Sequence, residues 1–262
     1  MASGGEARRC GWPMAEPERP PAWLERNYPA LCGAVLPLAG LLRRHCEEPA
    51  HAELEFRLGT RRGGRFSADV GFGASDEFLQ RCGSRGDSAD SPLCFSEWRE
   101  HMDYYYTLEG GTRVRTRVSY DSDKCTISTA TVAKELSERI ELACGTWSVR
   151  CDRSTERPVP AEEVPEFVKP EHVALASRAT ARYGPWRYDV TMRWDAESRT
   201  AVEALQRSSE SEPQYLVEIE FVGTRGDVER HGACYLMCSG LLKILDVVGC
   251  TDATVTRCAE VP

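Results

Sequence analysis

Hydrophobic and polar side chains alternate along most of the chain from residue 51 onward, with the period of two that is typical of β-strands. This alternation predicts strands at residues 52–58, 103–108, 112–120, 124–130, 140–143, 148–155, 174–183, 187–195 and 215–222. So many strands favour a closed antiparallel sheet, because closure removes the exposed sheet edges. We therefore expect an α+β fold, mainly antiparallel β, with about eight strands in a closed barrel and peripheral helices.

Helical spacing replaces the alternation in several places. Between residues 22 and 48, apolar side chains recur at helical intervals, and Pro29 and Pro37 divide the segment into two predicted short helices. Further helices are predicted at 75–81, 198–206 and 231–248, and residues 83–92 form a predicted loop rich in Ser, Gly and Asp. Residues 1–21 are rich in Pro, Gly, Glu and Arg, which predicts a flexible tail ahead of one domain over residues 22–258.

Composition narrows the class of protein. The 262 residues are 41% hydrophobic, which is enough for a sizeable core. With 33 Lys and Arg against 41 Asp and Glu, the net charge is -8, so binding to duplex DNA by bulk electrostatics is excluded. The N-terminal segment is polar and no apolar run reaches the ~18 residues of a membrane span, so we expect a soluble intracellular protein without a membrane partner.

Three of the predicted strands separate charged from apolar side chains. In the first, Glu53 and Glu55 share one face with Arg57, and in the last Glu218 shares a face with Glu220. A middle strand carries arginines on one face, at Arg113, Arg115 and Arg117. Taken singly, each could be a half-exposed strand with its charges in water.

Taken together, these strands indicate a site for phosphate and metal. Paired carboxylates offer the oxygen ligands that Mg²⁺ or Mn²⁺ prefers, and guanidinium groups match phosphate oxygens. If the sheet closes with its charged faces inward, both kinds of group line one lumen. Burying so many charges costs several kcal/mol per ion unless each is paired or ligated, so function has to account for them.

Other phosphate chemistry is excluded by missing motifs. The sequence contains no P-loop and no cysteine-phosphatase loop, and its five histidines are dispersed without the spacing of metal ligands.

In the order and spacing of its motifs, the sequence resembles the triphosphate tunnel metalloenzymes, and among them the metal-dependent mRNA 5'-triphosphatases of fungi, protozoa and large DNA viruses. The resemblance covers residues 50–222. The motifs that carry it are Glu53-Leu54-Glu55-Phe56-Arg57, Arg115-Thr116-Arg117, Lys134, Val149 to Val159 with Glu156, Arg178 to Tyr183, Arg187-Tyr188-Asp189-Val190-Thr191 and Val217-Glu218-Ile219-Glu220. Two positions depart from the family pattern, since Thr180 stands where a lysine is usual and Leu216 where a third glutamate is frequent.

The resemblance implies a role for each of these side chains. Glu53, Glu55 and Glu220 would ligate Mn²⁺ or Mg²⁺, with Glu218 and Asp189 holding metal-bound waters. Arg117, Lys134 and Arg182 would stabilise the transferred phosphoryl group, and Glu156 would activate the attacking water. The implied phosphate-binding set is Arg115, Arg117, Lys134, Arg150, Arg178 and Arg182.

Some alternatives stay open on the residues alone. Arg115 or Arg117 could be the phosphate ligand, Arg113 and Arg150 could form only internal salt bridges, and Lys134 could be a surface lysine. The tyrosines at 104–106 could stack on an RNA base or simply pack.

The activity implied by the resemblance is that of an mRNA-capping polynucleotide 5'-phosphatase. It would hydrolyse the γ-phosphate of triphosphate-ended RNA to a diphosphate end, with metal-dependent hydrolysis of nucleoside triphosphates as a side activity. An RNA guanylyltransferase is the expected partner, and the nucleus the expected location, or the cytoplasm for a viral protein. The alternatives are a tunnel hydrolase of small triphosphates or polyphosphate, and an inactive polyanion-binding scaffold.

Overall fold

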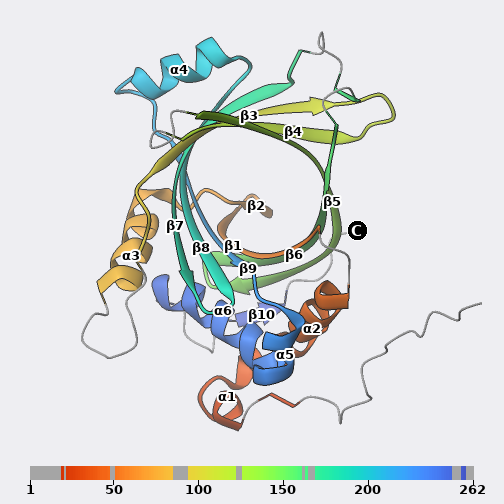
Figure 1. Ribbon diagram of the computed structural model, residues 1–262. Helices are drawn as coiled ribbons and strands as arrows, with labels where there is room; N and C mark the ends of the chain where they lie inside the picture. Colours follow the sequence, from red (N-terminus) through yellow and green to blue (C-terminus); the bar gives the residue numbers. More distant parts are fainter. Residues whose placement is uncertain are drawn as a thin grey trace, which may run out of the picture.

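Eight antiparallel strands close into a barrel, with the helices on its outside (Figure 1). The computed structural model describes residues 19–20, 22–47, 51–84, 94–121, 126–160, 163–164, 169–249 and 255–257. The barrel strands are β1 (Ala52–Arg62), β3 (Arg99–Thr107), β4 (Arg113–Asp121), β5 (Thr126–Cys144), β6 (Trp147–Pro158), β7 (His172–Tyr183), β8 (Trp186–Ala196) and β9 (Gln214–Phe221). Their order is β5-β4-β3-β7-β8-β9-β1, and β6 closes the ring by pairing with both β1 and β5. The predicted fold class is confirmed.

Two short strands and six helices complete the described chain. Strand β2 (Arg65–Ser67) extends β1 as a hairpin, and β10 (Val255–Arg257) pairs with the end of β5. The helices are α1 (Ala22–Asn27), α2 (Pro29–Glu47), α3 (Gly71–Ser84), α4 (Arg199–Arg207), α5 (Arg225–His231) and α6 (Ala233–Val247). Most of the predicted tail and the loop residues 85–92 lie outside the described residues.

The apolar face of the strands points outward and is covered by helices. On β1, Leu54, Phe56 and Leu58 are each at most 1% exposed, and they belong to one core cluster with apolar residues of α2 and α6. Burial of such a side chain stabilises the fold by about 1.5–3 kcal/mol. In Figure 1, α2, α5 and α6 lie beneath the barrel, α3 lies beside it, and α4 lies above it. This covering leaves the charged faces for the lumen.

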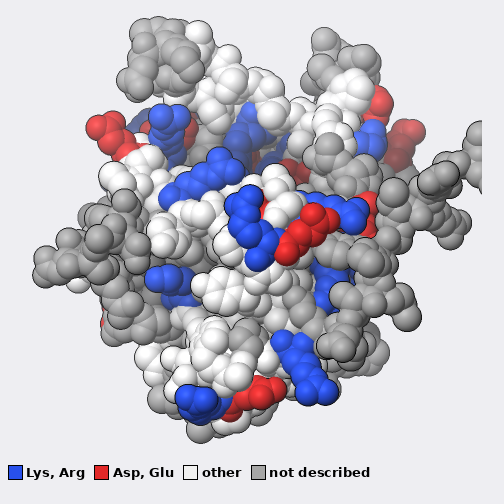
Figure 2. Space-filling model, turned by 60° about the horizontal axis from the view of Figure 1, so that its bottom comes forward, with Lys and Arg blue, Asp and Glu red and all other residues white. Residues whose placement is uncertain are grey.

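The surface formed on the helical side carries mixed charge. Figure 2 shows basic side chains singly or in small groups, with acidic side chains among them. Several are paired along a helix, as in Arg225 with Glu229 at 2.8 Å on α5. No described helix is both long and apolar enough to cross a membrane.

Strand β5 corrects the prediction of two separate strands at 124–130 and 140–143. It is a single strand of 19 residues with a β-bulge between Leu136 and Glu138. The extra residue shifts the alternation, so that Lys134 and Leu136 line the lumen before the bulge and Arg139 lines it afterwards. Because the alternation shifts by one residue at the bulge, a search for a fixed period of two predicts two separate strands here.

Two helix predictions also need correction. The predicted break at Pro37 is wrong, because α2 continues through it. Buried side chains on both sides of this residue, such as Val35 and Leu38, hold the helix against the barrel and outweigh the missing N–H. The segment predicted as one helix from 231 to 248 is α6, and α5 before it was missed. Its N-terminus is marked by a capping box of Thr224 and Asp227.

A charged triad anchors α2 to the outside of the barrel. Glu138 accepts hydrogen bonds from Arg44 of α2 at 2.8 and 2.7 Å, and from Arg153 of β6 at 3.0 Å. The Arg153 side chain is only 7% exposed, whereas Arg44 is 49% exposed. Glu138 therefore neutralises a guanidinium that lies against the apolar covering of the barrel.

Glu138→Gln is expected to lower the free energy of unfolding by about 1–3 kcal/mol, because the buried Arg153 would lose a charged partner. Urea denaturation at neutral pH measures the effect. The matched control is Arg44→Gln, which removes the exposed partner and should cost less than about 1 kcal/mol. Equal losses for the two variants would show that the triad does not act through Arg153.

Candidate active site in the barrel lumen

The lumen of the barrel is a cavity of about 690 Å³ lined mainly by charged side chains. Its cationic residues are Arg57, Arg115, Arg117, Lys134, Arg139, Arg178, Arg187 and Arg193. Its carboxylates are Glu53, Glu55, Asp103, Asp152, Glu156, Asp189, Asp195, Glu218 and Glu220. Eight cations face nine carboxylates, so the lumen has no surplus positive charge for a triphosphate. Binding such an anion there calls for additional cations.

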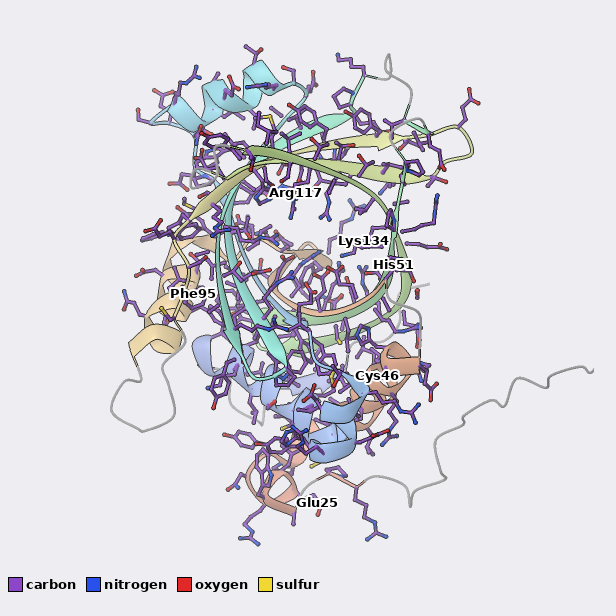
Figure 3. The ribbon with its side chains drawn as sticks, in the orientation of Figure 1. Glu25, Cys46, His51, Phe95, Arg117 and Lys134 are labelled. Atoms are coloured by element: carbon purple, nitrogen blue, oxygen red, sulfur yellow. The ribbon has the colours of Figure 1, made fainter. Side chains whose placement is uncertain are left out.

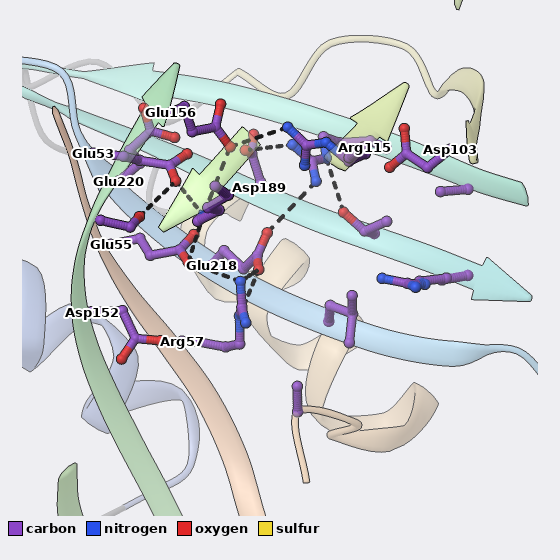
Figure 4. Close-up of a pocket in the computed structure, with 18 of the residues that line it drawn as sticks. Glu53, Glu55, Arg57, Asp103, Arg115, Asp152, Glu156, Asp189, Glu218 and Glu220 are labelled. Carbon is purple, nitrogen blue, oxygen red and sulfur yellow. Dashed lines mark hydrogen bonds and ion pairs between the residues drawn. The ribbon is translucent and has the colours of Figure 1, made fainter. Parts of the chain in front are cut away.

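The predicted metal-ligating glutamates come together on two neighbouring strands (Figure 4). Strands β1 and β9 are antiparallel, with Glu55 opposite Glu220 and Arg57 opposite Glu218. Glu53 lies two residues before Glu55 on the same face of β1. The sequence prediction that both carboxylate pairs face one lumen is therefore confirmed as a spatial arrangement.

Lys134 lines the cavity among these carboxylates. Its Nζ atom is 3.4 Å from Glu55 Oε1 and 3.9 Å from Glu156 Oε1, and it donates a hydrogen bond to Glu53. Figure 3 shows Lys134 on the wall of the barrel, with Arg117 on the wall above it. The contact with Glu55 and Glu53 raises the pKa of Lys134 although burial opposes this, so the amine stays charged.

Burial and mutual repulsion divide the glutamates into two kinds. Burial raises the pKa of Glu55 to about 7 and that of Glu220 to about 8, and neighbouring carboxylates add to both shifts. For Glu218, burial acts in the same direction but is outweighed by Arg57 and Arg178, which lower its pKa to about 2. The cluster thus holds more carboxylate than its own cations neutralise.

The donor set suits a divalent metal ion of the hard class. Glu53, Glu55 and Glu220 offer only carboxylate oxygens, the ligands that Mg²⁺ and Mn²⁺ prefer. Within the described residues, no three His, Cys, Asp or Glu side chains stand at the spacing of a formed metal site. The Lys134 ammonium instead contacts Glu53 and Glu55. The residues fit the ion by chemistry.

Arg115 has a buried N–H donor without a hydrogen-bond partner in the described part of the chain. Arg117 forms two hydrogen bonds of 2.7 Å with Asp103, from Nε and Nη2, so one side of its guanidinium is held by a carboxylate. Arg115 forms one hydrogen bond, of 3.1 Å, with Glu156, and its buried Nε has no hydrogen-bond partner. A buried donor without a partner is costly, and a phosphate oxygen would satisfy it. The geometry favours Arg115 over Arg117 as the phosphate ligand.

Asp189 is held by residues from two strands. Its Oδ1 accepts a hydrogen bond from Thr180 Oγ1 at 2.8 Å, and its Oδ2 accepts from Arg178 at 3.2 Å and Arg187 at 3.1 Å. Thr180, the residue that departs from the family pattern, therefore positions Asp189 and does not supply a cation. Arg187 places a positive charge beside Asp189 and also pairs with Glu220.

Two residues of the predicted phosphate-binding set do not line the cavity. Arg182 is exposed near the end of β7, where it donates a hydrogen bond to the Val222 carbonyl oxygen at 3.4 Å. Arg150 forms a 2.8 Å hydrogen bond with Glu141, and its guanidinium stacks on Phe66 at 3.9 Å from the ring centroid. Arg150 thus has the internal role that the sequence left as an alternative.

The structure adds lumen residues that sequence reasoning did not select. Arg187 is the first residue of the motif that contains Asp189, and it lies two residues before Asp189 on the same face of β8. This spacing could have identified Arg187 as a lumen residue. The others include His101, Arg57, Asp103, Arg139, Asp152, Arg193 and Asp195. Arg139 pairs with Asp152 and Arg193 with Asp195, whereas Asp103 pairs with Arg117 and Arg57 pairs with Glu55 and Glu218. Their partners lie on neighbouring strands or two residues away, and register alone could have suggested them.

Among the three consecutive tyrosines, Tyr105 alone lines the cavity. One face of its ring stacks on His172, with centroids 4.2 Å apart, and Arg193 lies 5.4 Å from its centroid. Because the ring already has these two partners, packing explains it better than stacking on an RNA base.

Solved structures of RNA triphosphatases are similar to this chain. The S. pombe Pct1 RNA triphosphatase is 16% identical, with a TM-score of 0.58 over 82% of this chain and 91% of that chain. In complex with the Spt5 CTD, the same enzyme is 16% identical, with a TM-score of 0.56 over 82% and 89% of the two chains. The RNA triphosphatase domain of a mimivirus mRNA capping enzyme is 11% identical, with a TM-score of 0.49 over 81% and 96%.

The sequence itself matches no protein-family model and no curated protein. At 16% identity, the likeness to Pct1 shows the fold. The chain has the fold of the RNA triphosphatase tunnels, as the sequence predicted.

His101 is expected to make the protein less stable at acidic pH. The side chain is buried, and burial, followed by the charge of Arg117, lowers the pKa of His101 from 6.5 to about 4. The unfolded chain therefore takes up a proton at a higher pH than the folded chain, and stability present above pH 6.5 is lost as the pH falls toward 4. The full loss is on the order of 3 kcal/mol.

Denaturation curves between pH 7 and 4.5 test this for wild type and His101→Gln. The glutamine variant cannot gain a proton, so its stability should fall less steeply over this range. Parallel curves for the two proteins would contradict a neutral buried histidine.

Proposed function

We propose that this chain is a divalent-metal-dependent RNA 5'-triphosphatase, which removes the γ-phosphate of triphosphate-ended RNA in the first step of cap formation. One observation carries the proposal: a single lumen places the glutamates of β1 and β9 among arginines and a lysine from β4, β5, β7 and β8. The fold that the chain shares with Pct1 supports the same activity. Nucleoside triphosphates would be accepted as smaller substrates of the same lumen.

Glu53, Glu55 and Glu220 would hold one Mn²⁺ or Mg²⁺ ion, with Glu218 and Asp189 hydrogen-bonded to its waters. When bound, the ion supplies a Lewis acid for the terminal phosphate and the positive charge that the lumen lacks. Arg57 and Arg178 keep Glu218 ionised for this purpose.

The remaining residues bind and orient the phosphate chain. Arg115, Lys134 and Arg178 would contact phosphoryl oxygens, and Arg187 would do so in place of Arg182. Arg117 would hold the wall in position through Asp103. In phosphoryl transfer, positioning and neutralisation of charge supply most of the catalysis.

Glu156 would accept the proton of the attacking water. It lies on β6 directly opposite Lys134 of β5, and it is hydrogen-bonded to Arg115 at 3.1 Å. The carboxylate thus lies beside two cations, within reach of a water bound near Lys134 and Arg115, which is the position a general base needs. The products would be orthophosphate and a 5'-diphosphate RNA end, on which a guanylyltransferase acts next. We propose nuclear residence on this role alone, or cytoplasmic residence for a viral protein.

Release of orthophosphate from RNA with a labelled γ-phosphate tests the activity. Wild type should release it with Mn²⁺ or Mg²⁺ and not with a chelator. Glu53→Ala and Glu220→Ala should lower kcat by at least about 10²-fold, since each removes a charged group from the reacting centre. Arg207→Ala, on the exposed face of α4, is the control and should keep wild-type activity.

The outcomes separate three functions. Turnover of thiamine triphosphate or polyphosphate but not of RNA would assign the chain to the small-substrate hydrolases of this fold. Tight binding of triphosphate without turnover of any substrate would indicate a scaffold.

A matched pair of arginines tests the reassignment from Arg182 to Arg187. The two residues are directly opposite each other on β7 and β8, but only Arg187 lines the cavity. Arg187→Ala should lower kcat/KM by about 10-fold or more, because a charged hydrogen bond contributes about 1.5–3 kcal/mol. Arg182→Ala should lower it by less than about 3-fold. The reverse order would restore the sequence-based assignment.

A further inference from the structure

The β1–β2 hairpin turns back over one end of the lumen. Along β1, the positions that face the lumen run from Glu53 through Glu55 and Arg57 to Gly59 and Arg61. The chain then reverses at two glycines with φ of 57° and 78°, and β2 pairs antiparallel with β1. Because Phe66 is directly opposite Arg61, its side chain takes the lumen face. In Figure 1, β2 lies within the outline of the ring, at the far end of the barrel.

The Phe66 ring and the β2 backbone occupy space that any side chain at position 59 would fill. A Cβ atom built on Gly59 would lie 2.3 Å from the Ser67 carbonyl oxygen and 2.5 Å from Phe66 Cζ, so both rest directly on the β1 backbone. Its partner is the guanidinium of Arg150, 3.9 Å from the ring centroid. Gly59 therefore has a packing role, which is to admit an aromatic ring into the lumen.

The charges beneath this ring are fully occupied with one another. Glu141 accepts hydrogen bonds from Arg150 Nε at 2.8 Å and from Ser148 Oγ at 2.9 Å, and it lies 3.3 Å from Arg61 Nε. Neither these residues nor Phe66 lines the cavity, whereas Ala68, just beyond β2, does, so the cavity ends in front of the hairpin. The hairpin thus separates the cavity from a polar layer, which consists of Arg61, Glu141, Ser148 and Arg150.

The chain that follows β2 is tied down at the same end of the barrel. Asp69 accepts hydrogen bonds from the backbone N–H groups of Tyr215 at 3.0 Å and Gly71 at 3.1 Å. Val70 N–H donates to the Tyr215 carbonyl oxygen at 2.9 Å. These contacts join the hairpin to the first residues of β9, so its position is fixed by the barrel itself.

We propose that the β1–β2 hairpin, with Phe66 at its centre, is a stopper that makes the lumen a blind tunnel for phosphate chains. The inference rests on the proposed function only in taking the lumen as the site of phosphate binding. The phosphate chain enters from the opposite end, where Glu53 and Glu156 stand, and advances no farther than the layer of Arg57 and Arg139. The substrate class is thereby restricted to chain ends, and the interior of a long polyphosphate cannot be threaded through.

The physical reason is that Phe66 offers phosphate no hydrogen-bond donor. An anion pushed against the ring would lose water without gaining a partner, which is unfavourable. Arg150, whose guanidinium lies against the ring, is neutralised by Glu141. Removal of the ring would both lengthen the tunnel and uncover Arg150.

The affinity for inorganic linear polyphosphates of increasing length tests the stopper. Titration calorimetry with tri-, tetra- and pentapolyphosphate and with longer chains should give, for wild type, an affinity that rises with length and then becomes constant. In Phe66→Ala the rise should continue to longer chains, with a gain of about 5- to 10-fold for the longest. Tripolyphosphate should bind equally well to both proteins.

Two further variants make the test specific. Phe66→Leu retains an apolar stopper and should behave as wild type, which also controls for folding. Phe66→Ala combined with Arg150→Ala should lose the gained affinity, because the newly exposed cation is absent.

The outcomes are distinct. The same length dependence in wild type and a folded Phe66→Ala variant would overturn the stopper. A shifted length dependence without release of phosphate from RNA would retain the stopper and reject the RNA triphosphatase. No binding of any polyphosphate would reject both.

Discussion

Side chains that point into a closed barrel share a confined space, and every charge among them has to be neutralised there. In this protein the alternation of β1, β4 and β9 sends glutamates and arginines inward together, and the lumen comes close to neutrality through ion pairs such as Arg117 with Asp103. The excess carboxylate gathers at the β1–β9 pair, where burial raises the pKa of Glu55 and Glu220. The outer arrangement follows from the same constraint. Once the charged faces are inside, the apolar faces need the covering that α2 and α6 supply.

Much of this arrangement could be predicted from the sequence because the period of two is strictly kept in the strands that matter. Glu53, Glu55, Glu218 and Glu220 share one cavity because residues two apart share a face, and closure of the sheet brings the first and last barrel strands together. The sign of the charge on the lumen-facing side chains of each strand could also be predicted, since charge is a property of the residue itself. Periodicity thus determines which side of the wall a residue faces.

Periodicity does not determine how far along the barrel a residue lies or what covers it. Arg182 has the same parity as Arg178, but it lies beyond the end of the cavity. Arg150 faces the lumen side, but the ring of Phe66 covers it. Phe66 reaches this position through the β1–β2 hairpin, which the periodicity of the strands does not predict. The choice between Arg115 and Arg117 likewise needed the cross-strand carboxylates, because the two arginines are equivalent in sequence. The position of a residue along the barrel and the groups that pack over it depend on strand register and turns, which are set by tertiary contacts.

The β-bulge in β5 makes the number of residues in that strand as informative as their identity. Before Ser137 the lumen takes the even-numbered residues such as Lys134, and after it the odd-numbered ones such as Arg139, while Ile140 and Leu142 pack outside. A chain shortened by this one small residue would keep every charged side chain and still exchange inside for outside along half of the strand. A substitution in β5 therefore changes one side chain, whereas a single insertion or deletion exchanges the lumen-facing and outward-facing residues along part of the strand. Relatives of this protein should accordingly vary in residue type at this place far more freely than in length.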